Sequence, residues 1–213
     1  ERKRLRRIIG YLCLRLGLDP AIPTCSGGLA MLAGDPVRSA ADLGIPMVAL
    51  ALLHRRGYFF QKLDASGWQT EEPAHWVVED FFEPLSESAV VWIEGRKVEI
   101  RAWRRDVVGN DGYNVPVILV DSDLSENTEY DRKLTHHLYG GDSRYRLCQE
   151  VVLGIGGLRM LRALGYTDIE RFHMNEGHAA FLALELLEEQ AKSGERQIAS
   201  PDDIEAVRQK CVF

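Results

Sequence analysis

Two short apolar runs, separated by a glycine turn and a helical stretch, constrain the fold of this chain most. Residues 8–16 and 46–53 are mostly apolar and are bounded by Gly, Pro and Asp, which is typical of strands buried on both faces. Between them, the Ser-Gly-Gly-Leu turn at 26–29 opens an apolar helical stretch. The order strand, glycine turn, helix, strand predicts an α/β protein with a layered sheet. Because Asp35 can cap a helix and Pro36 suits a first helical turn, we expect the helix to break there and to restart.

The same alternation continues along the chain. Residues 89–93 and 98–103 flank a Glu-Gly-Arg turn and predict a β-hairpin. Apolar residues at helical spacing predict a helix from 147 to about 165. The remaining predicted elements are strands over 115–120 and 169–174 and a helix over 176–190.

Composition narrows the class of protein. Lys and Arg number 26 against 32 Asp and Glu, a net charge of −6, so nothing favours nucleic acid or an anionic membrane as partner. The basic run at 1–7 is expected to be a solvated terminal segment. No apolar run approaches the ~20 residues of a membrane span, and we expect a cytoplasmic protein. The four cysteines are scattered, and no cysteine or histidine spacing favours a metal, so we expect reduced thiols and no metal site.

The glycine turn is the first segment that suits binding chemistry. Gly27 and Gly28 let the backbone approach a ligand, and the open N–H groups of the helical turn that includes Leu29 favour an anion such as phosphate. A plain tight turn is the alternative.

The second segment is the turn at 138–143, which carries Asp142 and Ser143 after two glycines. Such a loop can move over a sugar, with Asp142 accepting hydrogen bonds from hydroxyl groups. The alternative is that Asp142 or Ser143 simply caps the following helix.

The third segment, residues 172–178, stands where a strand ends and a helix begins. In open α/β sheets ligands bind at the carboxyl ends of strands, which makes Asn175, Glu176 and His178 candidate ligand residues. The alternative is helix capping.

The fourth segment, residues 57–73, sets aromatic rings beside amides and carboxylates. That mixture suits carbohydrate, because rings cover the C–H faces of sugars. The alternative is a hairpin packed by Tyr58, Phe59 and Phe60.

These four segments, in this order, resemble the α-glucan phosphorylases that act on glycogen, starch and maltodextrin. The likeness covers about residues 9–213. It is most specific in four motifs: SGGL with LAGD at 26–35, GWQ with EE at 67–72, LYGGD with RL and QE at 138–150, and MNEGH at 174–178.

The resemblance implies the α/β, Rossmann-like N-terminal lobe of a GT-B type glycosyltransferase, with an inserted β-hairpin region at about 57–113. It implies an allosteric enzyme of carbohydrate metabolism, in which phosphate cleaves a terminal α-1,4-linked glucose to give glucose 1-phosphate. The partners would be an α-1,4-glucan and phosphate, and the family allows a homodimer. Pyridoxal phosphate is the implied cofactor; its Schiff-base lysine belongs to a C-terminal lobe that we expect to be absent from this chain.

The resemblance also implies residue roles. Gly27, Gly28 and Leu29 match a turn beside the cofactor phosphate and the glucosyl unit. The loop that holds Asp142 and Ser143 matches a gate that touches the sugar. A segment lining the sugar site matches the three residues Asn175, Glu176 and His178.

Two residues depart from the family pattern. Arg15 stands where the family carries a glutamate, and Ala30 stands where the glycine turn usually has a further glycine. A guanidinium in place of a carboxylate inverts a charge, so either catalysis is impaired or the first strand has another register.

We therefore expect an enzyme fragment that is inactive by itself and contains no catalytic residue. The alternative is a non-catalytic glucan-binding or regulatory module. A nucleotide-binding domain of unrelated function is less favoured, because no Gly-x-Gly-x-x-Gly follows a strand.

Overall fold

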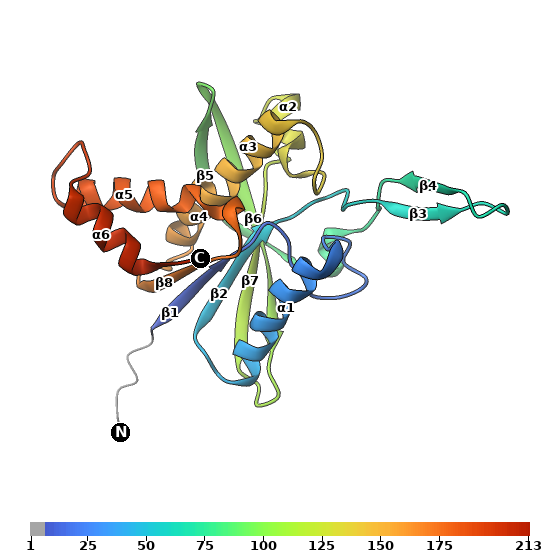
Figure 1. Ribbon diagram of the computed structural model, residues 1–213, viewed down its shortest axis with the longest axis horizontal. Helices are drawn as coiled ribbons and strands as arrows, with labels where there is room; N and C mark the ends of the chain where they lie inside the picture. Colours follow the sequence, from blue (N-terminus) through green and yellow to red (C-terminus); the bar gives the residue numbers. More distant parts are fainter. Residues whose placement is uncertain (1–6) are drawn as a thin grey trace.

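A seven-stranded sheet is the centre of the protein. The computed structural model describes residues 7–213, so the basic run that opens the sequence lies, apart from Arg7, outside the described residues. The strand order is β5-β6-β7-β2-β1-β8-β9 (Figure 1). Strands β7, β2, β1, β8 and β9 run parallel, whereas β5, β6 and β7 are antiparallel. The strands are β1 Ile8–Leu12, β2 Met47–Leu52, β5 Glu83–Ile93, β6 Arg96–Val108, β7 Asn114–Asp121, β8 Ile169–Met174 and β9 Cys211–Val212. The predicted layered α/β fold is confirmed, and its sheet is mostly parallel.

Strand β2 shows why the sheet lies between two layers of helices. Val48, Leu50 and Leu52 belong to the apolar cluster beneath helices α3 (Ser143–Val151), α4 (Gly157–Ala163) and α5 (Phe181–Ser193). Ala49 and Ala51 point to the opposite cluster, beneath helix α1 (Gly27–Asp42). Successive side chains of a strand point to opposite faces, so an uninterrupted apolar run covers both sides of the sheet.

Helix α1 is continuous, which corrects the predicted break at Pro36. The helix runs from Gly27 to Asp42 with Pro36 inside it. Proline removes one backbone hydrogen bond, but Ala33, Val37 and Ala40 are buried against the sheet on the same face. Packing along this face outweighs the local tendency of proline to end a helix.

The predicted helix over 147–165 is confirmed, with a wider turn in its middle. Helices α3 and α4 are joined by a π-helical stretch, η3 (Val152–Gly156). A Cβ atom on Gly157 would lie 2.7 Å from Cδ2 of Leu50, so only glycine lets α4 approach β2 this closely. Helix α5 begins later than predicted, after the short helix η4 (Gly177–Ala179), because Glu176 has a φ of 63° and cannot continue a right-handed helix.

Two hairpins occupy different places. The one predicted over 89–103 forms as β5 and β6, turns at Glu94-Gly95 and extends the main sheet through β7. The other, β3 (Phe60–Leu63) with β4 (Gln69–Glu72), projects from the body (Figure 1), and all of its strand residues are exposed. The rings of Tyr58 and Phe59 lie 4.4 Å apart, but Phe60 is 57% exposed. The interpretation of Phe60 as a packing residue is therefore wrong.

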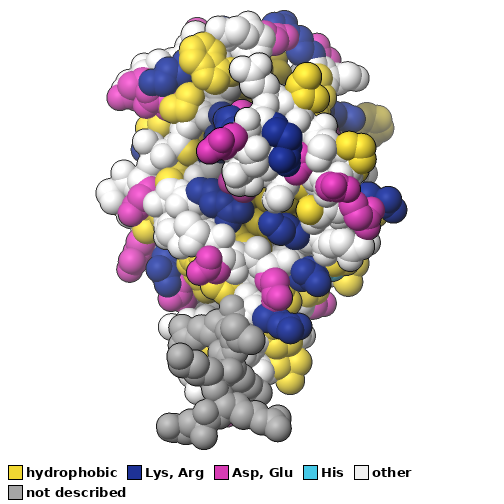
Figure 2. Space-filling view, turned by 90° about the vertical axis from the view of Figure 1, so that its left-hand side faces the viewer, with side chains coloured by type: hydrophobic (Ala, Val, Ile, Leu, Met, Phe, Trp, Pro, Cys, Tyr) yellow, Lys and Arg dark blue, Asp and Glu magenta, His cyan; other side chains and the backbone are white. Residues whose placement is uncertain are grey.

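The remaining short elements connect these layers. They are η1 (Val78–Asp80), α2 (Glu129–Arg132), η2 (Lys133–Thr135) and α6 (Pro201–Lys210). All four cysteines are free thiols. Figure 2 shows acidic and basic side chains interspersed on one face of the molecule. Among residues 7–213, no helix has the length and apolarity to cross a membrane, and no group of three metal-ligating side chains comes together.

Candidate ligand site at the carboxyl edge of the sheet

The pairing of β1 with β8 sets two candidate segments side by side. The two strands run parallel, with Leu12 opposite Met174. The backbone N–H of Asn175 donates a hydrogen bond of 2.8 Å to the carbonyl oxygen of Leu12. The chain that leaves β8 therefore begins beside the chain that leaves β1, at the edge where α/β proteins bind ligands.

A small pocket joins these segments to the start of α1. Leu29 meets Asn175 and Glu176 there. The pocket is lined by Cys13, Leu14, Arg15, Leu29, Asn175 and Glu176. Residues that lie far apart in the sequence thus line one pocket.

The glycine turn faces open space. No atom lies within 4 Å of the position that a Cβ would take on Gly27 or Gly28, and Gly27 has a φ of 71°. Ser26 occupies the N-cap position, yet its side chain makes no capping hydrogen bond. The first amides of this 16-residue helix are therefore not occupied by a side-chain cap and can bind an anion.

His178 lies between two carboxylates. Its Nδ1 is 3.1 Å from Oε1 of Glu150, and its Nε2 is 3.5 Å from Oε2 of Glu176. Carboxylates only accept hydrogen bonds, so the contact with Glu150 places a hydrogen on Nδ1. The two contacts fix the plane of the ring beside Glu176, which lines the pocket. Glu150 belongs to the QE motif of the sequence, but nothing in the sequence indicates its contact with His178.

Three of the five non-glycine residues with left-handed backbone angles in the described chain lie near this edge, and the other two, Glu94 and Glu195, lie in exposed turns. The three near this edge are Glu176 after β8, His54 after β2 and Tyr139 in the 138–143 loop, with φ values of 63°, 46° and 59°. Such conformations are unfavourable for these residue types and cluster at functional sites. The strain supports the assignment of this edge as the candidate site.

The 138–143 loop reaches the pocket through Tyr139. The guanidinium carbon of Arg15 lies 4.6 Å from the centre of the Tyr139 ring. Asp142 is instead the N-cap of α3, where its Oδ1 accepts a hydrogen bond of 2.9 Å from the N–H of Tyr145. The capping alternative therefore describes Asp142 in this conformation. Ser143 is the exposed first residue of α3, and no described contact joins either residue to the pocket.

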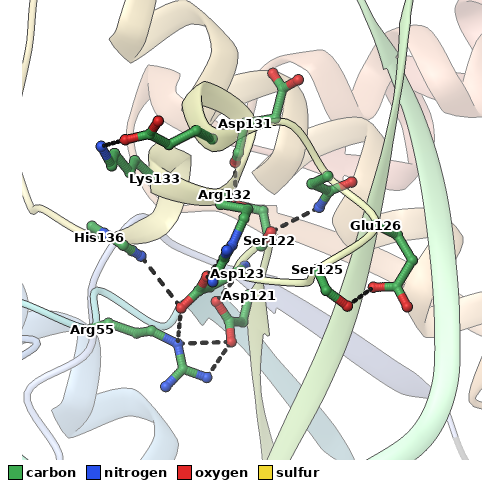
Figure 3. A network of polar contacts seen from close by, with 12 residues as sticks. Arg55, Asp121, Ser122, Asp123, Ser125, Glu126, Asp131, Arg132, Lys133 and His136 are labelled. Atoms are coloured by element: carbon green, nitrogen blue, oxygen red, sulfur yellow. Dashed lines mark hydrogen bonds and ion pairs between the residues drawn. The ribbon is translucent and has the colours of Figure 1, made fainter.

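A polar network anchors the approach to this loop (Figure 3). Asp121 is fully buried and accepts hydrogen bonds of 3.0 Å from Nε of Arg55 and from Nε of Arg101. Burial by itself would raise the pKa of Asp121, but the hydrogen bond and charge of Arg55, with the charge of Arg101, hold that pKa below its usual range. Thr135 also donates to Asp121, at 3.1 Å, which ties the short helix that precedes the loop to the end of β7.

His54 is a neutral, buried support of the same edge. Its Nε2 lies 2.9 Å from the carbonyl oxygen of Leu14. Burial lowers the pKa of His54 to about 4, and the nearby charge of Arg15 acts in the same direction. At neutral pH the ring is therefore uncharged, and it holds the end of β1 against the end of β2.

Comparison with known proteins finds several relatives that are named as phosphorylases. The chain is 42% identical over 193 residues to a glycogen phosphorylase of Mycobacterium tuberculosis and 40% identical over 178 residues to a maltodextrin phosphorylase of Thermococcus litoralis. These alignments cover 85% and 80% of this chain. A glycogen phosphorylase of Aquifex aeolicus is 29% identical over 98% of the chain. No protein-family model matches.

The chain spans only part of each relative. It covers 22% of the Mycobacterium protein, 21% of the Thermococcus protein and 30% of the Aquifex protein. The chain belongs to the glycogen and maltodextrin phosphorylase family and corresponds to an N-terminal portion of it.

Proposed function

We propose that this chain forms part of the N-terminal lobe of a GT-B type α-glucan phosphorylase. The complete enzyme would transfer a terminal α-1,4-linked glucosyl unit to phosphate and release glucose 1-phosphate. One observation carries the proposal: Leu29 of the glycine turn shares a pocket with Asn175 and Glu176 of the MNEGH motif. The relatives are named for this reaction class, and the pocket joins two of the four motifs on which the resemblance rests, SGGL and MNEGH.

The residues of this chain would bind and orient substrate. The open amides at Gly27 and Gly28 would hold a phosphate group, because helix N-terminal N–H groups favour anions. Asn175, Glu176 and His178 would contact sugar hydroxyl groups from the other side of the pocket. Asp142 and Ser143 would take part only if the loop rearranges, because Asp142 now caps α3.

The residues present fit only the phosphate end of the family's cofactor. The amides before α1 suit its phosphate, but the pocket lining contains no lysine. Lys62, Lys97, Lys133 and Lys192 are all paired with carboxylates on the surface. When bound, pyridoxal phosphate supplies its phosphate group as a proton partner. In this proposal its lysine comes from a C-terminal lobe outside this chain.

The experiment is a phosphorolysis assay on the full-length protein that contains this chain. Maltodextrin and phosphate are supplied, and release of glucose 1-phosphate is measured for wild type, His178→Ala and the surface control Glu126→Ala. The proposal is supported if the wild-type protein and the control release glucose 1-phosphate and His178→Ala does not. A wild-type protein that binds its cofactor yet releases no glucose 1-phosphate contradicts it.

A non-catalytic glucan-binding module is a second candidate, and one observation favours it. Arg15, where the family has a carboxylate, is 95% buried in the pocket lining, so its charge is part of the site. Maltodextrin binding without phosphorolysis in the cofactor-loaded protein would select this alternative.

A further inference from the structure

Arg15 is buried without a hydrogen-bonding partner for two of its nitrogen atoms. The residue is only 5% exposed, and Nε and one terminal nitrogen have no partner among the described residues. Leaving charged donors unpaired in the interior is strongly unfavourable. A buried guanidinium of this kind is poorly explained as a structural residue and is well suited to receive an anionic ligand.

The surroundings leave the donors of Arg15 available. Tyr139 covers the guanidinium, 4.6 Å from ring centre to Cζ, and a cation–π contact leaves the in-plane N–H groups free. Glu176 lines the same pocket, but its carboxylate lies 3.5 Å from His178, and no ion pair joins it to Arg15 in the described chain. Leu29, in the first turn of α1, also lines the pocket.

We propose that Arg15 binds an oxyanion, inorganic phosphate or the phosphoryl group of a sugar phosphate, at the carboxyl end of β1 beside the first turn of α1. The planar guanidinium holds its N–H donors in fixed directions, and such donors suit the oxygens of a phosphoryl group. The amides of α1 add partial positive charge. A family member with a carboxylate at this position has no such donor.

The size of the pocket couples binding to the Tyr139 loop. The pocket measures about 10 Å³, which is about the room for one water molecule. A phosphoryl group therefore enters only if the pocket widens. The element above it contains Tyr139, Gly140 and Gly141, two of which have left-handed backbone angles. Arg15 and the loop would thus respond together to the anion.

The inference rests on the proposed function only for the choice of phosphate as a probe. The test uses calorimetric titration of the full-length protein with inorganic phosphate, glucose 1-phosphate and glucose at constant ionic strength. The variants are Arg15→Met, Arg15→Lys and the control Arg208→Met, which removes an exposed charge from α6. Thermal unfolding without ligand is measured for each, and phosphorolysis is assayed separately.

We expect Arg15→Met to weaken phosphate binding by about tenfold to a hundredfold, the usual effect of losing hydrogen bonds to a charged group. Arg15→Lys should be weakened less, and Arg208→Met should bind like wild type. Without ligand, Arg15→Met should unfold at the same temperature as wild type or higher, because an unpaired buried charge has been removed. A purely structural arginine would give the opposite change in stability.

Unchanged phosphate affinity in Arg15→Met, or a clear loss of its stability without ligand, overturns the inference. Equal Arg15-dependent losses for both phosphate probes identify the phosphoryl group alone as the ligand, and a larger loss for glucose 1-phosphate identifies the sugar phosphate. If phosphate binding depends on Arg15 but the full-length protein has no phosphorolysis activity, the proposed function is contradicted and this inference stands. If the full-length protein catalyses phosphorolysis and Arg15→Met binds phosphate normally, this inference fails and the proposed function stands.

Discussion

Oε1 of Glu150 lies 3.1 Å from Nδ1 of His178, although one residue belongs to α3 and the other to η4. The contact orients the imidazole beside Glu176, which lines the pocket. It also sets the first prediction, because a ring held by a carboxylate loses its fixed plane when that carboxylate is removed.

Glu150→Ala should weaken maltodextrin binding by the full-length protein by ~1.5–3 kcal/mol, the range for hydrogen bonds that involve a charged group. Glu150→Gln keeps an acceptor at the same place and should lose less. Affinity is measured by calorimetry, with Glu126→Ala as an exposed control. If both Glu150 variants bind like wild type, His178 is not positioned through this contact.

Acid should destabilise the protein through His54. The pKa of His54 falls from 6.5 to about 4 on folding, so the unfolded chain binds the proton more readily. Its contribution is complete above pH 6.5 and is lost as the pH falls through 4, amounting to roughly 3 kcal/mol. Denaturant unfolding between pH 7 and 4 checks this.

The matched variants for that measurement are His54→Gln and His75→Gln, since His75 is exposed. The slope of stability against pH should flatten only in the first. Asp121, whose pKa is held low, adds its own loss at lower pH, below its ordinary value of 3.8. An unchanged slope in His54→Gln would assign the acid sensitivity to other groups.

Gly141→Ala should destabilise the protein more than Gly95→Ala. Both glycines have positive φ, which makes either substitution unfavourable by ~1–2 kcal/mol. A Cβ on Gly141 would also lie 2.6 Å from Cβ of Tyr145, whereas a Cβ on Gly95 meets nothing within 4 Å. The difference between the two unfolding free energies therefore measures the clash. Equal losses would show that the loop moves to relieve it.

The Tyr139 loop should exchange its amide hydrogens faster than the helices after it. The glycines lower the barrier to motion, while the flanking network at Asp121 and Thr135 stays fixed. Hydrogen exchange is compared between residues 139–143 and 147–163. Equal protection in the two segments would argue against a gate.

The 213-residue chain alone should not release glucose 1-phosphate from maltodextrin and phosphate. Transfer needs the sugar, the phosphate and the cofactor to be held together, and such positioning supplies ~7–11 kcal/mol of barrier reduction. The assay compares the short chain with the full-length protein, each incubated with pyridoxal phosphate. Turnover by the short chain would show that this lobe contains the complete machinery. An inactive full-length protein that gains activity in Arg15→Glu would assign the defect to Arg15.

Sequence patterns predicted most elements of the sheet because local and tertiary forces agree there. The strand over 169–174 coincides with β8, and the apolar run at 46–53 contains β2. The break at Pro36 was predicted wrongly, since a single missing hydrogen bond is visible in the sequence whereas the packing of α1 on the sheet is not. Helix α5 starts late because the backbone of Glu176 is left-handed. A glycine would have suggested such a conformation in the sequence, but a glutamate does not.

The candidate site was predictable only as a location. Strand-end reasoning indicated this edge of the sheet, because parallel strands deliver their following loops to one edge. The unpaired state of Arg15 and the contact of Glu150 with His178 depend on side-chain directions in three dimensions. Charge and spacing along the chain do not contain that information.

The alternation along β2 also limits how this lobe can change by insertion. Leucine and valine point to one layer of helices and alanine to the other, so α1 packs against small residues while α4 meets large ones. One residue added within β2 would exchange the two sets downstream of it. The leucines would then clash with α1, and the alanines would leave voids beneath α4. Length variation among relatives should therefore be confined to the loops, and an alignment gap inside residues 47–52 would signal an error in the alignment.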